Sequence, residues 1–150
     1  MINGSLSGGA LRCGTDLVDV DRIYRAIERL GKPFLIRVFT PAELADCLND
    51  GQLTLAAAAS LAARFAAKEA VAKALGTGIW RNGVNWTDIT IRRSESGAPV
   101  AELSGGARKV YDKLGGQSLA ISLSHERKLA LAFCVLTCRL ADQKNDHAQP

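Results

Sequence analysis

The sequence predicts a single compact α+β domain in which an antiparallel sheet packs against a long central helix. The stretch from residue 53 to residue 75 contains neither Gly nor Pro and is dominated by Ala, as a long uninterrupted helix requires. Beyond residue 78, apolar and polar residues alternate in short runs that are separated by turns. We see no internal repeat and no linker, so these elements belong to one unit.

A short strand and two helices are predicted before the long helix. Residues 11–16 form an apolar run that ends in a carboxylate, which predicts a strand. Residues 19–30 place apolar side chains on one helical face, and Gly31 ends this helix. The segment 40–43 (Thr-Pro-Ala-Glu) has an N-cap, a proline and a glutamate in the order of a helix start, so a short helix is expected to about residue 48.

Strands dominate the second half of the chain. Alternation over residues 87–92 and a shorter run over 99–103 predict two strands joined by a turn. Residues 104–116 are predicted to form a helix, with a Ser as its N-terminal cap and a Gly-Gly pair at its end. Two last strands are expected, one over 119–123 and one over the nearly continuous apolar run 128–138. This last run does not alternate, which predicts burial on both faces.

Composition sets limits on the class of protein. With 150 residues, 47% of them hydrophobic, the chain can bury a real core. A net charge of +4 and a pI near 9.0 favour acidic partners such as phosphorylated ligands, nucleic acid or an acidic protein. The four cysteines show no CxxC pair and no zinc-ligand spacing, so we expect reduced core residues of a cytoplasmic protein.

The ends of the chain differ from its middle. Residues 1–10 are rich in Gly and Ser and lack a signal-peptide pattern, so we expect a flexible N-terminal segment. The domain is expected over 11–138, followed by a polar tail over 139–150. Charges interrupt the Ala-rich helix, so no contact with a membrane is expected.

Four charges on the long helix point to chemistry. Arg64 and Lys68 share one helical face, whereas Glu69 and Lys73 share another. An ordinary surface pair of Glu69 and Lys73, worth roughly 0.2–0.5 kcal/mol, is the plain alternative. Because residues 61–75 contain no other polar side chain, burial is the better interpretation. Buried ions must be paired, bound to a metal or used.

A carboxylate pair could bind a divalent cation. Asp16 closes Gly14-Thr15-Asp16 at a strand end, where a helix N-cap is the plain alternative for the carboxylate. Together with Glu69, Asp16 could hold Mg²⁺, which usually takes one or two protein carboxylates and completes its shell with water and phosphates. Lys73 would then stand beside a phosphate as a point charge.

Three further features are weaker signals. The glycines of the segment 76–78 (Gly-Thr-Gly) could bring backbone N–H groups to an anion, although a simple helix C-cap is favoured on sequence alone. A polar cluster at 122–126 contains His125, and such a histidine is more often structural or exposed. Arg22, Arg25 and Arg29 form a basic stripe on the first helix.

Three motifs together resemble the holo-[acyl-carrier-protein] synthases, the small bacterial type of 4′-phosphopantetheinyl transferase. They are Gly14-Thr15-Asp16, the stretch 64–78 (RFAAKEAVAKALGTG) and Ser122-Leu123-Ser124-His125. The middle motif is highly specific, and the outer two are strong in combination. The resemblance covers roughly residues 11–136, whereas residues 80–86, the stretch after residue 96 and the polar tail depart from the family pattern.

The resemblance implies a Mg²⁺-dependent enzyme that moves the 4′-phosphopantetheine of coenzyme A to a serine of apo acyl carrier protein and releases adenosine 3′,5′-bisphosphate. It implies the 4′-phosphopantetheinyl transferase fold, a homotrimer with coenzyme A between subunits, and a metal held by Asp16 and Glu69. Catalysis is assigned to Asp16, Glu69 and Lys73. Glu69, directly or through a metal-bound water, is the candidate base, and His125 is expected to contact the nucleotide.

The remaining site residues follow from the same picture. Coenzyme A contacts are expected from Arg64, Lys68, Lys73, Gly76, Thr77, Gly78, Ser124 and His125. The stripe of Arg22, Arg25 and Arg29 is expected to meet the acidic carrier. One rival is a non-catalytic phosphate- or nucleic-acid-binding module, although an aromatic content of 5% argues against stacking on single strands. Another rival, a degenerate structural relative, is disfavoured by the presence of Asp16, Glu69 and Lys73 together.

Overall fold

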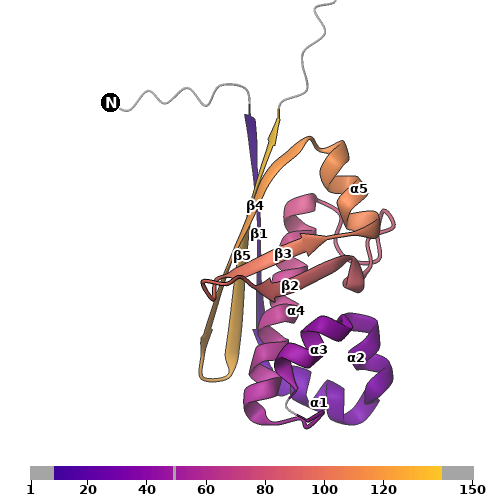
Figure 1. Ribbon diagram of the computed structural model, residues 1–150, viewed down its shortest axis with the longest axis vertical. Helices are drawn as coiled ribbons and strands as arrows, with labels where there is room; N and C mark the ends of the chain where they lie inside the picture. The colour runs from indigo at the N-terminus through magenta and orange to yellow at the C-terminus, as the bar shows by residue number, and fades with distance from the viewer. Residues whose placement is uncertain (1–8, 49, 140–150) are drawn as a thin grey trace, which may run out of the picture.

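The computed structural model describes residues 9–48 and 50–139 and has an α+β architecture (Figure 1). The predicted tail from 140 onward and residues 1–8 lie outside the described part. In chain order the elements are β1 (Gly9–Asp19), α1 (Val20–Leu30), α2 (Lys32–Val38), α3 (Pro41–Cys47), α4 (Leu55–Leu75), the 3₁₀ turn η1 (Trp86–Asp88), β2 (Ile89–Arg93), β3 (Pro99–Leu103), α5 (Gly105–Lys113), β4 (Gly116–Glu126) and β5 (Leu129–Arg139).

The long helix α4 lies between two antiparallel sheets. A three-stranded sheet in the order β1-β5-β4 covers one side of α4, and the hairpin β2-β3 crosses its other side (Figure 1). The helices α1–α3 gather around one half of α4, whereas α5 lies near its other end (Figure 1). Within the described ranges, no helix combines the length and apolarity needed to cross a membrane.

Small side chains make α4 suitable for this central place. Thr54 accepts a hydrogen bond from the amide of Ala57 at the start of the helix, and Gly76 ends it in the left-handed conformation at φ 80°. Thirteen of the 21 residues of α4 are buried, and eight of the thirteen are Ala. Alanine lets backbone elements approach the helix closely, so α4 can be packed on several sides.

The two faces of the three-stranded sheet differ sharply. On the inner face, Ala130, Ala132 and Cys134 of β5 are fully buried against α4. On the outer face, Leu131 is 42% and Phe133 43% exposed. A single chain therefore buries one face of β5, and the predicted burial of both faces requires a further layer.

Several expected boundaries change in the structure. β1 begins at Gly9 and is longer than predicted because it pairs with β5 over its whole length. Residues 9 and 10 thus belong to β1 and not to a flexible segment, and Arg139 belongs to β5 and not to the tail. Helix α2 was not predicted, and residues 87–88 form part of η1 instead of a strand.

The cysteines are free, as expected, but one of them does not lie in the core. Cys47, Cys134 and Cys138 are buried, whereas Cys13 is exposed. The prediction of four core cysteines was wrong for Cys13 because this residue points to the outer face of β1, where the alternation of the strand places it.

Candidate active site

The candidate site forms where β1 touches α4. At Gly14 a Cβ atom would collide with the carbonyl oxygen of Ala70 and would lie 2.7 Å from the backbone nitrogen of Ala74 and 2.9 Å from Cβ of Lys73. Nearby, Arg12 Nε donates a hydrogen bond of 2.8 Å to the carbonyl oxygen of Ala74. Only glycine permits this contact between backbones, and it brings the residues after Gly14 next to the charged face of α4.

Asp16 and Lys73 join the two elements directly. Lys73 Nζ donates hydrogen bonds of 2.9 Å to Asp16 Oδ1 and of 2.8 Å to the carbonyl oxygen of Thr15. The Asp16 side chain is 18% exposed, whereas that of Lys73 is 49% exposed. The ammonium group therefore remains accessible to a ligand while its position is fixed by two oxygen atoms. The alternative role of Asp16 as a helix N-cap does not apply, since Asp19 caps α1.

Glu69 completes this cluster, one helical turn before Lys73. Burial raises the pKa of the Glu69 carboxyl, the negative charge of Asp16 raises it further, and Lys73 opposes both effects. The negative charge of Asp16 thus acts on Glu69 in the direction expected for two neighbouring carboxylates. A cation placed between them would remove this repulsion.

The donor set suits a hard divalent cation. Two carboxylates from different elements are the ligands that Mg²⁺ prefers, with its remaining positions filled by water and phosphate oxygens. In the described part of the chain no group of three or more His, Cys, Asp or Glu side chains could hold a metal. A pair of carboxylates leaves most of the shell of such a cation to water and substrate oxygens, in contrast to a closed structural metal site.

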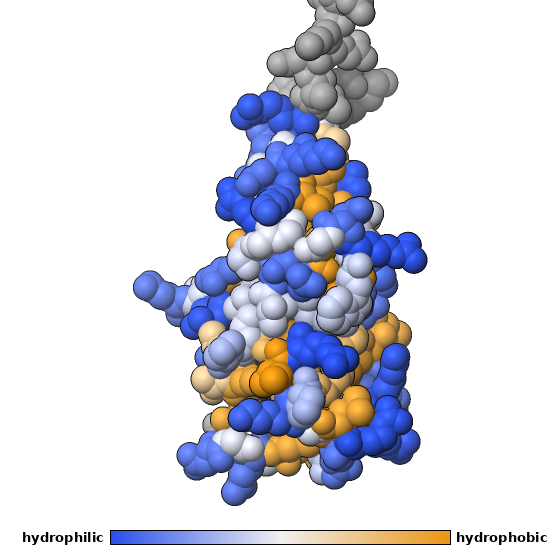
Figure 2. All heavy atoms as spheres, turned by 90° about the vertical axis from the view of Figure 1, so that its right-hand side faces the viewer, coloured by the Kyte–Doolittle hydropathy of each residue, from blue (hydrophilic) through white to orange (hydrophobic). Residues whose placement is uncertain are grey.

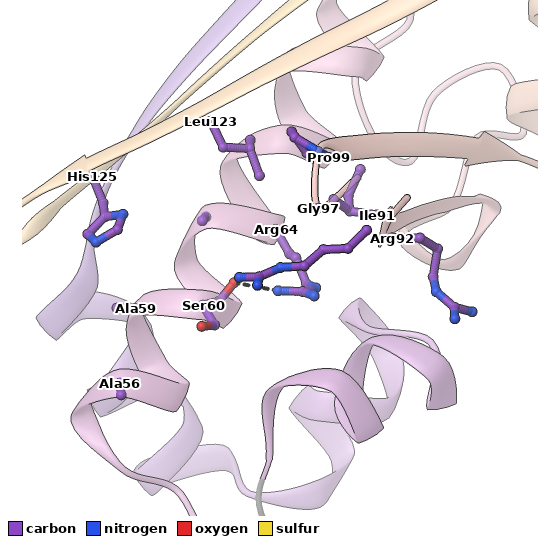
Figure 3. Close-up of a pocket in the computed structure, with 12 residues that line it drawn as sticks. Ala56, Ala59, Ser60, Arg64, Ile91, Arg92, Gly97, Pro99, Leu123 and His125 are labelled. Carbon is purple, nitrogen blue, oxygen red and sulfur yellow. Dashed lines mark hydrogen bonds between the residues drawn. The ribbon is translucent and has the colours of Figure 1, made fainter. Parts of the chain in front are cut away.

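A second cluster of predicted residues lies on the other side of α4. Arg64 and His125 line a cavity of about 510 Å³ together with Arg92 and Arg93 of β2 (Figure 3). Arg64 is buried, and its Nη1 donates a hydrogen bond of 3.4 Å to the carbonyl oxygen of Ser60. The cavity is thus rich in positive charge, as an anion-binding site requires.

Helix and sheet geometry separate the two clusters. Arg64 and Lys73 are nine residues apart, which at about 100° per residue places them on opposite faces of α4. In the sheet, Asp16 pairs with Ala132 and Ala132 with Leu123, which lines the cavity together with His125 of the same strand. Two strand spacings, about 10 Å, therefore lie between the backbones of Asp16 and Leu123. The structure brings together Asp16, Glu69 and Lys73, and separately Arg64 and His125.

Lys68 does not fit the predicted contact with coenzyme A. Its side chain is fully buried, and Nζ lies 2.7 Å from Glu43 Oε2. It also donates to the carbonyl oxygens of Val38 at 2.7 Å and of Trp86 at 3.0 Å. An ammonium group has three hydrogens, and these three partners occupy all of them. Lys68 therefore has a structural role, in which it joins α4 to the segments before α3 and β2.

The segment after α4 is a helix cap, the alternative that the sequence favoured. The amides of Thr77 and Gly78 both donate to the carbonyl oxygen of Ala72, and the amide of Gly76 donates to that of Lys73. These three N–H groups are occupied in the cap, so they are not free to bind an anion. The contact of Gly76, Thr77 and Gly78 with coenzyme A stays a prediction. Ser124 is exposed on the opposite face of β4 from His125, so of these two only His125 lines the cavity.

The predicted basic stripe forms on α1. Arg22, Arg25 and Arg29 are exposed and line a groove that Leu30 and Phe34 also border. Figure 2 shows apolar surface between charged side chains at the end of the molecule formed by α1–α3. Three carboxylates, those of Asp19, Asp21 and Glu28, also line this groove, so it combines charges of both signs with apolar contact area.

Sequence reasoning missed Asp46 and Arg92. Asp46 Oδ2 lies 3.7 Å from Arg64 Nη2 and 3.6 Å from Arg92 Nε. Both residues stand in elements that were predicted, but nothing in the sequence indicates that α3 and β2 meet beside Arg64. Glu43 was identified only as part of a capping box, and the box is present. Its burial beside Lys68 could have been suspected, because each is a charge within an apolar stretch.

The comparisons with known proteins identify the family of this chain. A family model described as the 4′-phosphopantetheinyl transferase superfamily matches residues 12–134. The chain is 45% identical to a holo-[acyl-carrier-protein] synthase of Ruminiclostridium cellulolyticum over 126 residues, which cover 83% of this chain and 90% of that protein. It is 42% identical to one of Solibacter usitatus over 123 residues, 82% of this chain and 94% of that protein.

Solved structures give the same result. The Helicobacter pylori holo-[acyl-carrier-protein] synthase in complex with coenzyme A superimposes with a TM-score of 0.71 at 34% identity, covering 83% of this chain and 98% of that one. The Neisseria meningitidis enzyme gives a TM-score of 0.73 at 36% identity, with 83% and 96% covered. This chain therefore belongs to the 4′-phosphopantetheinyl transferase superfamily, and within it to the holo-[acyl-carrier-protein] synthases.

Proposed function

We propose that this enzyme transfers the 4′-phosphopantetheine group of coenzyme A to a serine of apo acyl carrier protein and releases adenosine 3′,5′-bisphosphate. The cluster of Asp16, Glu69 and Lys73 carries this proposal, because it presents two hard anionic ligands and one accessible cation at a single place. The bond that forms joins the serine oxygen to phosphorus, and the bond that breaks joins that phosphorus to the bridging oxygen of the diphosphate.

Asp16 and Glu69 are the residues that would hold Mg²⁺. When bound, the ion supplies positive charge to the diphosphate oxygens, which is the main need of phosphoryl transfer. The raised pKa of Glu69 supports this assignment, since two neighbouring carboxylates in a partly buried site are stabilised by a cation. The contact between Gly14 and α4 sets the separation of the two carboxylates.

Lys73 offsets negative charge on the phosphate that leaves. Its hydrogen bonds to Thr15 and Asp16 fix the ammonium group before substrate arrives, so little reorganisation is needed during the reaction. Its half-exposed position leaves room for a phosphate oxygen. This role explains why a lysine, a compact point charge, stands here.

Glu69 accepts the proton of the carrier serine. A base works best when its pKa approaches the working pH, and burial together with Asp16 moves the pKa of Glu69 in that direction. His125 lies on the other side of α4 in the same chain, beside the arginine-lined cavity. His125 is therefore assigned to nucleotide binding and not to proton transfer.

The cavity of Arg64 and His125 receives the 3′-phosphate of coenzyme A. The diphosphate is placed at the carboxylate pair, and the 3′-phosphate is the remaining strong anion of the nucleotide. Arg64 offers a buried guanidinium, and the arginines of β2 add positive charge. The volume of about 510 Å³ is adequate for part of a nucleotide.

A homotrimer accounts for the separation of the two clusters. One coenzyme A molecule cannot easily reach both clusters of one chain, because α4 stands between them. In a trimer, the cavity of one subunit adjoins the carboxylate pair of the next. The outer face of the three-stranded sheet supports this assembly, since Leu11 is 67% and Leu17 59% exposed in the single chain. Apolar area of this kind is typically covered by a symmetric copy.

The carrier protein docks on α1. Its acidic surface complements Arg22, Arg25 and Arg29, which steer the encounter of the two proteins. Leu30 and Phe34 add apolar contact area beside this stripe. The free cysteines support the cytoplasm as the compartment in which these proteins meet.

Thermal unfolding with coenzyme A, with and without Mg²⁺, tests the ligand assignment. We expect coenzyme A to raise Tm, and Mg²⁺ to increase the shift. A gel-shift assay with DNA and RNA in parallel tests the polyanion-binding alternative. Strong nucleic-acid binding with no response to coenzyme A would contradict the proposed function.

Mixing two inactive variants tests the composite site. Arg64→Ala damages the nucleotide cavity and Lys73→Ala damages the catalytic cluster. After the subunits are exchanged, mixed trimers contain some sites in which both parts are intact, so we expect activity to return. Absence of recovery, with subunit exchange verified by mass spectrometry, would contradict a site shared between subunits.

A further inference from the structure

Asp46 stands between two arginines of the cavity. Its Oδ2 atom lies 3.7 Å from Arg64 Nη2 and 3.6 Å from Arg92 Nε. Both distances are too long for a hydrogen bond but short enough for electrostatic attraction. One carboxylate therefore faces two guanidinium groups without satisfying their N–H donors.

Two buried donors of these arginines have no hydrogen-bond partner in the described part of the chain. Among the described residues, Arg64 Nε and Arg92 Nε are buried nitrogen atoms without a hydrogen-bond partner. The Arg64 side chain is only 7% exposed, and both arginines line the cavity (Figure 3). Buried donors without partners are costly, and an anion in the cavity would satisfy them.

Asp46 is not needed to hold these arginines in place. A more deeply buried contact already joins α3, α4 and β2, the three elements that carry Asp46, Arg64 and Arg92. Lys68 Nζ lies 2.7 Å from Glu43 Oε2, and the amide of Ile91 donates a hydrogen bond of 3.0 Å to Glu43 Oε1. Lys68 is one turn after Arg64, Glu43 is three residues before Asp46, and Ile91 precedes Arg92. The buried contact thus fixes α3, α4 and β2, and the partly exposed Asp46 pairs contribute little to stability.

We propose that Asp46 lowers the anion affinity of the cavity by competing with the bound phosphate for Arg64 and Arg92. This inference rests on the proposed function, in which the cavity holds the 3′-phosphate of coenzyme A and of the product. The cavity then binds the substrate nucleotide strongly enough for catalysis, and the built-in negative charge lets adenosine 3′,5′-bisphosphate leave. Asp46 thus sets the balance between binding of coenzyme A and release of adenosine 3′,5′-bisphosphate.

Calorimetric titration with adenosine 3′,5′-bisphosphate tests this role. Asp46→Asn keeps the shape of the side chain and removes its charge, so we expect the Kd to fall roughly five- to tenfold. The Ki of the same compound as a product inhibitor should fall by a similar factor. The matched control is Asp112→Asn, which removes a carboxylate that pairs at 2.9 Å with Arg108, an arginine that does not line the cavity. This control should leave Kd and Ki unchanged.

The outcomes separate this inference from the proposed function. If the wild type binds the bisphosphate and Asp46→Asn binds it equally or more weakly, the role of Asp46 is overturned and the proposed function stands. Inorganic phosphate serves as a second probe. If the bisphosphate does not bind but phosphate binds more tightly to Asp46→Asn than to the wild type, the role of Asp46 holds and the nucleotide assignment fails. If neither probe binds, the inference is overturned.

Discussion

Asp16 and Lys73 are 57 residues apart in the sequence and form an ion pair of 2.9 Å that joins β1 to α4. The same ammonium group also donates to the carbonyl oxygen of Thr15, so the pair is part of the packing between the two elements. Glu69 stands one turn earlier on α4 and senses the charge of Asp16. Catalytic geometry and the contact between strand and helix are therefore set by the same residues.

Removal of either carboxylate should abolish most turnover. Asp16→Asn and Glu69→Gln each remove a hard anionic ligand, and Glu69→Gln also removes the base, so we expect a loss of roughly a hundredfold or more in kcat. The assay is transfer to an apo carrier over a range of Mg²⁺ concentrations, with circular dichroism to verify the fold. Asp112→Asn is the matched control. A folded variant of Asp16 or Glu69 with near wild-type turnover would contradict the assignment.

Lys73→Ala should affect the reaction more than the binding of the carrier. Loss of one preorganised positive group at a reacting phosphate typically costs about 10²–10³ in kcat. Carrier affinity, measured by surface plasmon resonance, should stay the same because the carrier docks on α1. A normal kcat together with weakened carrier binding would contradict the assignment of Lys73 to the reacting phosphate.

Ionised Glu69 should destabilise the folded protein. The pKa of Glu69 is raised in the folded protein, so the folded state binds the proton of this carboxyl more tightly than the unfolded state does. This difference stabilises the fold at low pH. The stabilisation is lost as the pH rises through the pKa of the folded state. Glu69→Gln is neutral at every pH. In Mg²⁺-free buffer we expect the variant to have a higher Tm than the wild type at pH 7. The difference in Tm should shrink when the pH falls below the ordinary pKa of glutamate. An equal difference at all pH values would argue against a raised pKa.

Charge reversal on α1 should weaken only the encounter with the carrier. Arg22→Glu combined with Arg25→Glu should raise the KM for the carrier roughly five- to tenfold and flatten its dependence on salt, because exposed charges are screened over about 10 Å at 0.1 M salt. The KM for coenzyme A should change little. Arg37→Glu, an exposed charge outside the groove, is the control. An unchanged carrier KM would mean that the stripe is only a solvated surface.

Lys68→Met should destabilise the fold much more than Lys73→Ala, because the ion pair of Lys68 is buried and that of Lys73 is half-exposed. Removal of one partner of a buried ion pair leaves Glu43 as an uncompensated buried charge, which typically costs about 3–5 kcal/mol. The free energy of unfolding, from urea titration, measures the difference between the two variants. Similar losses for both would contradict the separation of structural and catalytic lysines on α4.

The sequence predicted those parts of the fold that depend on local signals. The long helix, the caps at Thr40 and Gly76, and the last two strands follow from spacing and turn residues. The cap of α1 was not predicted, since the N-cap alternative was placed at Asp16 and the structure has Asp19 there. Helix α2 was missed because seven residues with a proline near the start carry little periodicity. Local patterns therefore predict long helices and strands well, but they predict short connecting helices poorly.

The site was predictable only in part, for a similar reason. The pairing of Asp16 with the charged face of α4 follows from motif spacing and a family resemblance, and the structure places these residues together. The partner of Lys68 and the place of Asp46 depend on how α3 and β2 pack against α4, which no local pattern contains. Lys68 was therefore assigned to a ligand although its three donors are used inside the core.

The most direct test is mass spectrometry of an apo acyl carrier protein after incubation with this protein, coenzyme A and Mg²⁺. We expect the carrier to gain the mass of one phosphopantetheine group on its serine, and adenosine 3′,5′-bisphosphate to appear in equal amount. Glu69→Gln and omission of Mg²⁺ should each prevent the gain. An unmodified carrier with the folded wild-type protein, across several apo carriers, would contradict the account.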